Sequence, residues 1–185
     1  MTKTALVVID VQNDYFPGGK KPLHEPEQAL HQIRLLLAQF RQQQQPIIHI
    51  QHVMLNHPNR PATFFIAGTE GVEIHPGVEP QANEVVLQKH FPSSFAGTGL
   101  HDLLQQNGIQ QLVICGMMTQ MCVDTTTRAA FDLGYQVQVA LDATACPALS
   151  FGDTEIPAET VKATVAAALH GTFALVTDTE TILSA

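Results

Sequence analysis

The sequence has no apolar run long enough for a signal sequence or a membrane span. Near the start, only residues 5–9 are continuously apolar before Asp10 interrupts them, whereas a span needs about 20 such residues. Basic residues are scarce and scattered: 9 Lys and Arg stand against 17 Asp and Glu, for a formal net charge of −8. Without a basic stripe, we expect neither nucleic acid nor an anionic membrane as a partner.

Cysteine is scarce as well. Cys115, Cys122 and Cys146 are an odd number in a chain of ordinary size, which does not indicate a disulfide framework. The sequence has no Cys-x-x-Cys pair, the spacing typical of a zinc site. We therefore expect a protein of the reducing cytoplasm with no cofactor.

Neither a repeat nor a linker interrupts the chain, and 185 residues suit a single domain over residues 1–185. Apolar runs predict strands at residues 5–9, 47–50, 85–87, 112–115, 137–141 and 173–176. Patterns between them predict helices at residues 29–40, 100–106, 120–133 and 158–169. This alternation indicates a parallel sheet covered on both faces, so the predicted fold class is α/β, a three-layer α/β/α sandwich.

Residues 54–83 fit no regular element, and they contain Pro58, Pro61, Pro76 and Pro80. A long irregular segment in a compact domain is often a binding loop. We expect this one to help close a site, either in its own domain or in a neighbouring copy. Phe64, Phe65 and Ile66 would offer the apolar contact to a neighbour.

Three reactive side chains follow predicted strands: Asp10, Lys89 and Cys122. Each has an ordinary alternative, because Asp10 could cap a turn, Lys89 could be a solvated lysine and Cys122 could be a small core residue. In a parallel sheet, however, the carboxyl ends of the strands meet at one rim, where ligands bind. We therefore expect the three side chains to form one site.

Cys122 has the surroundings of a nucleophile. The predicted strand before it ends at Gly116, and a helix is expected to begin near Thr119, which puts the thiol in a first helical turn. The helix dipole and a nearby Lys89 ammonium would favour the thiolate, and Asp10 could take the thiol proton. Cys115 lies in an apolar strand and Cys146 precedes a proline on a loop, so neither is a candidate.

Four segments carry a resemblance to a known family: residues 5–19 around Asp10, Gly68–Ile74, Lys89–Phe95, and Gly116–Val123 with the pattern Gly-x-x-Thr-x-x-Cys-Val. In order and spacing they resemble the isochorismatase-like cysteine hydrolases, and residues 14–19 are similar to streptothricin hydrolase-like members. The resemblance implies a Rossmann-like, six-stranded parallel sheet and a homo-oligomer, either a dimer or a tetramer. It also implies a catalytic triad of Asp10, Lys89 and Cys122.

The resemblance implies details of the site as well. A cis peptide bond is expected between Met117 and Met118, with the N–H groups of Met118 and Cys122 forming the oxyanion hole. Tyr15 matches a position that packs on the substrate. Phe64 and Phe95 are further candidates for substrate contacts.

Nicotinamidases of this superfamily bind a metal through an Asp-x-His pair, which here aligns with His52-Val53-Met54. Methionine is a poor ligand for a borderline divalent ion, and His49 and His52 cannot face the same way on one strand. We therefore expect no metal and interpret these histidines as surface or pocket residues without a special role.

The predicted function is a cysteine hydrolase that cleaves a C–N bond of a small amide, lactam or ureido compound through an acyl-Cys122 thioester. The small-molecule substrate itself is left open. Alternatives are nicotinamidase-like or isochorismatase activity, or a non-hydrolytic thiol or binding protein.

Overall fold

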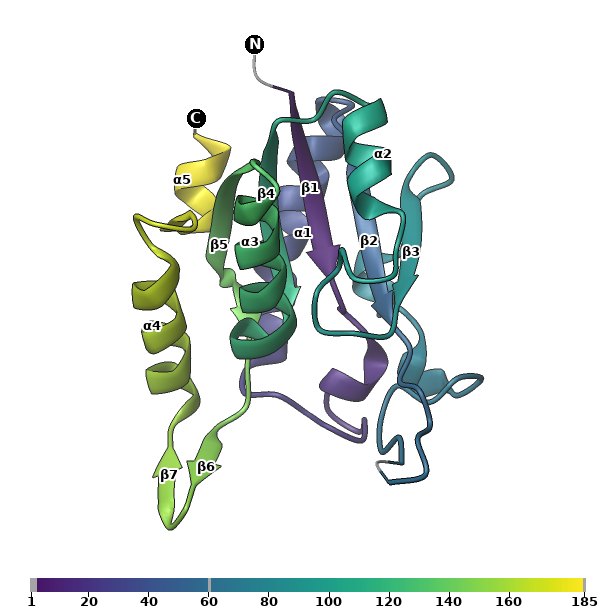
Figure 1. Ribbon diagram of the computed structural model, residues 1–185, viewed down its shortest axis with the longest axis vertical. Coiled ribbons are helices and arrows are strands. Elements are labelled where there is room, and N and C mark those ends of the chain that lie inside the picture. Colours follow the sequence, from purple (N-terminus) through teal and green to yellow (C-terminus); the bar gives the residue numbers. More distant parts are fainter. Residues whose placement is uncertain (1–2, 60, 185) are drawn as a thin grey trace.

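One parallel sheet organises the protein, a computed structural model of which describes residues 3–59 and 61–184. Six strands run in the order β3-β2-β1-β4-β5-β8, and every neighbouring pair is parallel (Figure 1). Their bounds are β1 Thr4–Ile9, β2 Ile47–His52, β3 Val85–Lys89, β4 Gln111–Met117, β5 Gln136–Ala145 and β8 Leu175–Thr177. The predicted α/β fold with a six-stranded parallel sheet is confirmed.

Helices cover both faces of this sheet (Figure 1). One face carries α1 Pro26–Gln42 and α5 Thr179–Leu183. The other carries α2 Leu100–Gln106 and α3 Asp124–Asp132, with α4 Ala158–Leu169 packed beside α3. Among the described residues, no helix is both long and apolar enough to cross a bilayer.

Strand β1 shows why the sheet is buried on both sides. Leu6 and Val8 belong to the apolar cluster under α1, whereas Val7 and Ile9 belong to the cluster under α2 and α3. Successive side chains of a strand point to opposite faces. A strand between two helical layers therefore needs a continuous apolar run instead of an alternating one.

Three elements differ from the prediction. The expected helix over residues 120–133 is a π-helical turn, η4 Thr119–Val123, followed by α3. A hairpin of β6 Leu149–Phe151 and β7 Thr154–Ile156 turns at Gly152, whose φ is 58°, and its strands are too short to show a pattern. Helix α5 was also not predicted; the Asp178 side chain caps it by accepting the Thr181 N–H at 2.8 Å.

The described residues of the loop, 54–59 and 61–83, are irregular, as predicted, apart from the short 3₁₀ turns η2 Glu70–Val72 and η3 Pro76–Val78. Phe65 is completely buried in its own domain, and Phe64 packs against the same core cluster. The expectation that Phe65 is offered to a neighbouring copy is therefore wrong. The loop folds back because Phe65 finds Tyr15 as an aromatic partner.

The strand order places a crevice beside β1. From β1 the chain builds outward through β2 and β3 on one side, and through β4, β5 and β8 on the other. Connections therefore diverge between β1 and β4, which is the topological switch point at which open α/β sheets bind ligands. The carboxyl ends of β1 and β4 lead directly to Asp10 and to η4.

Candidate active site

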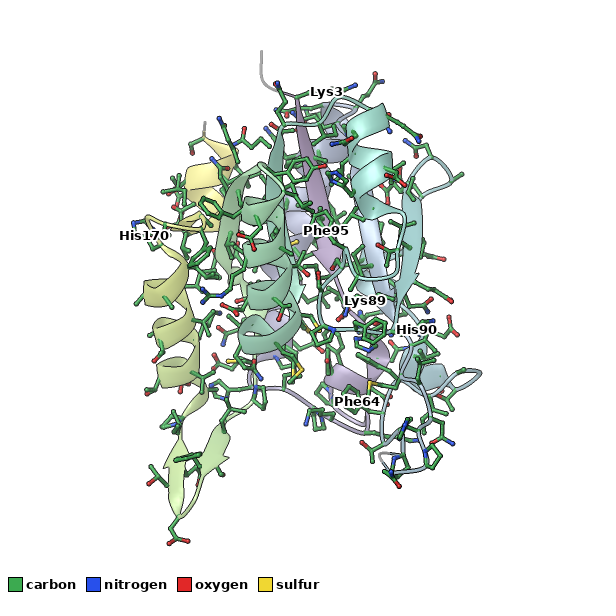
Figure 2. All side chains as sticks on the ribbon, viewed as in Figure 1. Lys3, Phe64, Lys89, His90, Phe95 and His170 are labelled. Atoms are coloured by element: carbon green, nitrogen blue, oxygen red, sulfur yellow. The ribbon has the colours of Figure 1, made fainter. Side chains whose placement is uncertain are left out.

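The structure brings the three predicted reactive side chains together. Asp10 follows β1, Lys89 ends β3 and Cys122 lies in η4. The Lys89 Nζ is 2.8 Å from Asp10 Oδ2 and 3.2 Å from Cys122 Sγ. All three residues are at most 1% exposed. Figure 2 shows Lys89 near the lower end of the sheet, where these strands end.

Two backbone features set this geometry. Asp10 adopts a left-handed conformation with φ 50°, an uncommon state for a residue with a side chain, held here by its N–H bond to Ile50 O at 3.0 Å. Gly116 has φ 118°, and a Cβ atom there would lie 2.0 Å from Ile9 O. Only glycine lets the last residues of β4 approach the end of β1 so closely.

The thiol of Cys122 differs from its predicted state. Burial raises its pKa, and the Asp10 carboxylate raises it further, whereas the Lys89 ammonium acts in the opposite direction. The predicted effect of Lys89 on the pKa of the thiol is therefore confirmed, but burial and Asp10 outweigh it. The reason is that Cys122 lies in η4, a π-helical turn in which the thiol is buried, instead of in the first turn of an α-helix.

The backbone directly before the turn that carries Cys122 has the predicted cis peptide bond. The peptide bond between Met117 and Met118 is cis, and Met118 is 2% exposed. Met118 precedes η4, whose turn carries Cys122.

The other two cysteines lie elsewhere. Cys115 is fully buried within β4, with Sγ 3.9 Å from Val7 O. Cys146 is 2% exposed, and its Sγ lies 3.3 Å from Ala158 O. Burial raises the pKa of both thiols, and neither contacts Asp10 or Lys89 in the hydrogen bonds described.

His52 is a site residue that the sequence interpretation missed. Its Nδ1 lies 2.8 Å from Lys89 Nζ, 3.7 Å from Asp10 Oδ2 and 4.0 Å from Cys122 Sγ. The Gln12 side chain holds its backbone, accepting the His52 N–H at 2.7 Å and donating to the His52 carbonyl at 2.9 Å. His52 ends β2, so the rule that selected the other three residues could also have found it.

The cluster could be mistaken for a metal site. Asp10, His52 and Cys122 each offer a ligand atom, and these atoms lie within 4.8 Å of one another. The Lys89 ammonium, however, contacts all three side chains. A metal ion would have to displace this buried charge, so the donor set fits an ammonium group.

Aromatic side chains form one wall near the site. The Tyr15 ring lies 4.5 Å from the Phe65 ring and 5.9 Å from the Phe64 ring, and the His52 ring lies 6.1 Å from Phe65. Phe95 lies elsewhere: it stacks on Tyr135 with ring centroids 6.1 Å apart and packs in the core under α2. Figure 2 shows Phe64 and Phe95 on opposite sides of Lys89. The wall is therefore formed by Tyr15, Phe64 and Phe65.

Asp14 holds this wall in place. Its Oδ2 accepts the Phe65 N–H at 2.7 Å, and its Oδ1 accepts the Lys20 N–H at 3.1 Å. Gly71 must be glycine, because a Cβ atom there would lie 2.2 Å from the Asp14 carboxylate. The buried carboxylate thus ties the loop over residues 54–83 to the end of β1.

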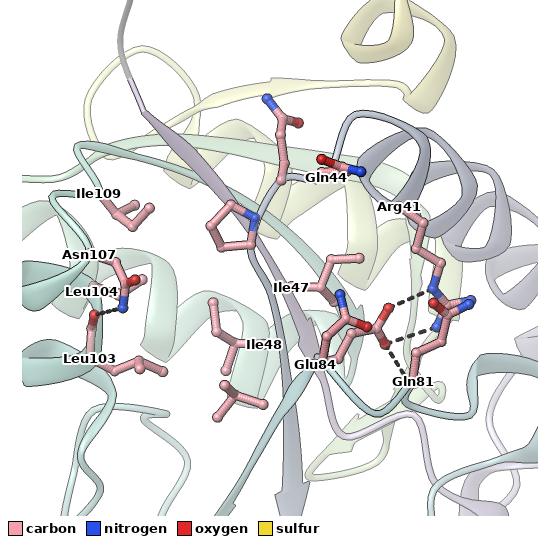
Figure 3. Close-up of a pocket in the computed structure, with 14 residues that line it drawn as sticks. Arg41, Gln44, Ile47, Ile48, Gln81, Glu84, Leu103, Leu104, Asn107 and Ile109 are labelled. Atoms are coloured by element: carbon pink, nitrogen blue, oxygen red, sulfur yellow. Dashed lines mark hydrogen bonds and ion pairs between the residues drawn. The ribbon is translucent and has the colours of Figure 1, made fainter.

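A separate pocket of about 280 Å³ lies at the opposite, amino ends of β2 and β3 (Figure 3). Glu84 borders this pocket. Its carboxylate accepts a hydrogen bond from Arg41 Nε at 2.6 Å, and His49 Nε2 lies 2.8 Å from the same carboxylate. Burial acts to raise the pKa of Glu84, but hydrogen bonds from Arg41, the Gln81 N–H and His49 outweigh it and bring the pKa to about 2. His49 thus faces a different partner from His52, as the strand parity predicted.

Comparison with known proteins identifies the family of this chain. The chain is 47% identical over 180 residues to the isochorismatase-family protein YddQ of Bacillus subtilis, covering 97% of this chain and 98% of that one. It is 36% identical to a streptothricin hydrolase of Streptomyces noursei over 75% of this chain and 48% of that one. The crystal structure of a candidate isochorismatase hydrolase of Oleispira antarctica superimposes with a TM-score of 0.94 at 42% identity, covering 100% of this chain and 97% of that one. The family model for the isochorismatase domain matches residues 4–180, and the chain belongs to this family of hydrolases.

Proposed function

We propose that the protein hydrolyses a C–N bond of a small amide, lactam or ureido compound through a thioester on Cys122. The observation that carries the proposal is the buried contact of Lys89 with both Asp10 and Cys122. A cysteine, a carboxylate and an ammonium in mutual reach are the parts that covalent acyl transfer requires. The aromatic wall beside this buried cluster supports a small organic substrate.

The first half of the reaction forms the acyl-enzyme. Asp10 takes the proton of the Cys122 thiol while Sγ bonds to the carbonyl carbon, and the carbonyl electron pair moves to oxygen. Collapse of the tetrahedral intermediate breaks the C–N bond, and the leaving nitrogen takes the proton back from Asp10. Because burial raises the pKa of the thiol, proton removal is coupled to attack.

The second half regenerates the enzyme. Water attacks the thioester carbon and gives one proton to Asp10. The C–S bond then breaks, and Cys122 recovers that proton. The products are an amine or ammonia and a carboxylic acid, or its carbamate analogue from a ureido compound. Throughout, the Lys89 ammonium balances the negative charge that moves between Asp10 and Cys122.

We further propose that the N–H groups of Met118 and Cys122 bind the oxyanion. The position of Met118 directly before the turn that carries Cys122 supports this assignment. Two backbone donors need no reorganisation during reaction, and losing one such donor typically costs about 2.7–4 kcal/mol of transition-state stabilisation.

The test is a screen of small amides that begins with streptothricin, because a streptothricin hydrolase is among the relatives. Ammonia or amine release reports turnover, and intact-protein mass spectrometry reports an acyl adduct on Cys122. Cys115→Ala is the matched control, since it removes another buried thiol. Turnover by a protein whose Cys122 forms no acyl adduct would contradict the proposal in favour of another chemistry. Binding of every candidate amide without turnover would contradict it in favour of a binding role.

We also propose that the protein acts as a homo-oligomer in the cytoplasm. Phe151 on the projecting β6–β7 hairpin is 84% exposed and Leu175 is 50% exposed, which supports a covered surface in an assembly. Light scattering at micromolar concentration tests it: we expect at least a dimer that Phe151→Ser weakens, and a monomeric mass would contradict it.

A further inference from the structure

Hydrogen bonds use every proton of the Lys89 ammonium. Nζ lies 2.8 Å from His52 Nδ1, 3.0 Å from Phe91 O and 3.2 Å from Cys122 Sγ, and it forms an ion pair with Asp10 Oδ2 at 2.8 Å. A lysine ammonium has three N–H groups, one for each of the three hydrogen bonds. Since Lys89 is 1% exposed, these contacts fix the position of the ammonium.

The tautomer of His52 follows from this network. An ammonium can only donate, so Nδ1 must accept, and the ring is neutral with its proton on Nε2. Nε2 has no hydrogen-bond partner among the residues that the structure describes. The 2.8 Å contact with Nδ1 is thus the main polar contact of this ring, and it is shorter than the contact between Lys89 and the thiol.

Thiolate formation changes the balance between these acceptors. A thiol sulfur is a weak acceptor, and its contact with Nζ is the longest of the three hydrogen bonds. A thiolate needs a stronger, charge-assisted hydrogen bond. The His52 Nδ1 holds Nζ at 2.8 Å and lies 4.0 Å from Sγ, so it is the acceptor beside the sulfur that competes for the ammonium.

We propose that His52 is a positioning residue that competes with Cys122 for the Lys89 ammonium. In the resting enzyme His52 holds Nζ closer than the sulfur does, and the ammonium shifts towards sulfur when the thiolate forms. The inference rests on the proposed function only in taking Cys122 as the nucleophile. The other ionisable groups that face the cluster are Asp10 from β1 and Tyr15 and Asp14 from η1 Asn13–Tyr15, and all of them stay unchanged in the variants below.

The test is the pH profile of Cys122 alkylation by iodoacetamide, read at peptide level by mass spectrometry. His52→Leu and His52→Phe remove the competing acceptor and leave the N–H free for sulfur. We expect the apparent pKa of Cys122 to fall by about one unit, which means roughly tenfold faster alkylation below both pKa values. His52→Asn keeps an acceptor atom near the position of Nδ1 and should restore the wild-type profile within about twofold.

His49→Asn is the matched control, because it removes another buried histidine of the same strand and should leave the profile unchanged. Folding of each variant is checked by circular dichroism. A folded His52→Leu or His52→Phe with the wild-type profile would overturn the inference, as would a His52→Asn profile that matches His52→Leu. A purely structural role would lower turnover without moving the alkylation profile.

A second measurement needs no variant at His52. Nitrogen-15 NMR of the wild-type protein near neutral pH should show His52 with an unprotonated Nδ1 and a protonated Nε2, and Lys89→Met should shift the Nδ1 resonance. A proton on Nδ1 would overturn the inference. Neither experiment uses an amide substrate, so a failed substrate screen would remove the proposed function while these results still decide the role of His52.

Discussion

The two ends of strands β2 and β3 carry two different buried charge clusters. At the amino ends, Glu84 is fully served, since Arg41, His49 and the Gln81 N–H all donate to it or contact it. At the carboxyl ends, Lys89 spends its three N–H groups on His52, Phe91 and Cys122. Both carboxylate oxygens of Asp10 lack a hydrogen bond among the described residues, although Oδ2 forms an ion pair with Lys89. A buried network in which every acceptor has a hydrogen bond stabilises the fold, whereas a network with unpaired acceptors can transfer a proton.

The largest effect should come from removing the nucleophile. Cys122→Ala should lower hydrolysis at least about a thousandfold, because no acyl-enzyme can form. Cys115→Ala and Cys146→Ala should keep most of the activity, because neither thiol contacts the cluster. Steady-state rates on the substrate found in the screen check this. Retained turnover in Cys122→Ala would show that the cluster at the carboxyl ends of the strands does not supply the nucleophile.

The second largest effect should come from Asp10→Asn, which should lower the rate of hydrolysis about 10²–10⁴-fold because an amide cannot accept the thiol proton. It also leaves the Lys89 ammonium buried without its partner, and breaking a buried pair typically costs about 3–5 kcal/mol of folding stability. Rates and urea unfolding should therefore both change. Wild-type activity in a folded Asp10→Asn protein would exclude it as the base.

Lys89→Met should slow alkylation of Cys122, the opposite of the result expected for the acceptor-removing variants at His52. The reason is that the ammonium lowers the pKa of the thiol and methionine does not. Lys89→Arg should rescue only in part, because a planar guanidinium fits poorly into a site that is 1% exposed. Iodoacetamide rates against pH decide it, and superimposable profiles for wild type and Lys89→Met would remove Lys89 from the triad.

At the amino end, Glu84→Gln should reduce stability while hydrolysis remains near the wild-type rate. The folded pKa of Glu84 is about 2, below the ordinary value of 4.5. A depressed carboxyl pKa contributes stability that is present above about pH 4.5 and is lost as the pH falls towards 2. Urea unfolding at several pH values should show this loss in the wild type and a flatter profile in Glu84→Gln. A matching loss of turnover would show that the two ends are coupled.

The smallest expected effect is that of chelation, which should leave activity unchanged. The Lys89 ammonium occupies the position between Asp10, His52 and Cys122 that a metal would need. Activity before and after dialysis against a chelator, with elemental analysis of the protein, checks this. A stoichiometric transition metal that restores lost activity would contradict it.

The sequence alone determined the layered fold and the three reactive positions. Val- and Ile-rich runs such as residues 5–9 require burial on both faces, and the carboxyl ends of parallel strands converge whatever the details of packing. For this reason Asp10, Lys89 and Cys122 could be placed at one rim from their order in the chain.

Only the tertiary structure decided the protonation state and the full membership of the site. Desolvation depends on what packs around a group, so the raised pKa of Cys122 could not follow from its place near a helix start. His52 stands at a strand end, as the other three residues do, but its contact with Lys89 depends on Gln12, which holds the His52 backbone. Phe65 joined the site because Asp14 binds its N–H across 51 residues of sequence. A contact over that separation leaves no local pattern in the chain.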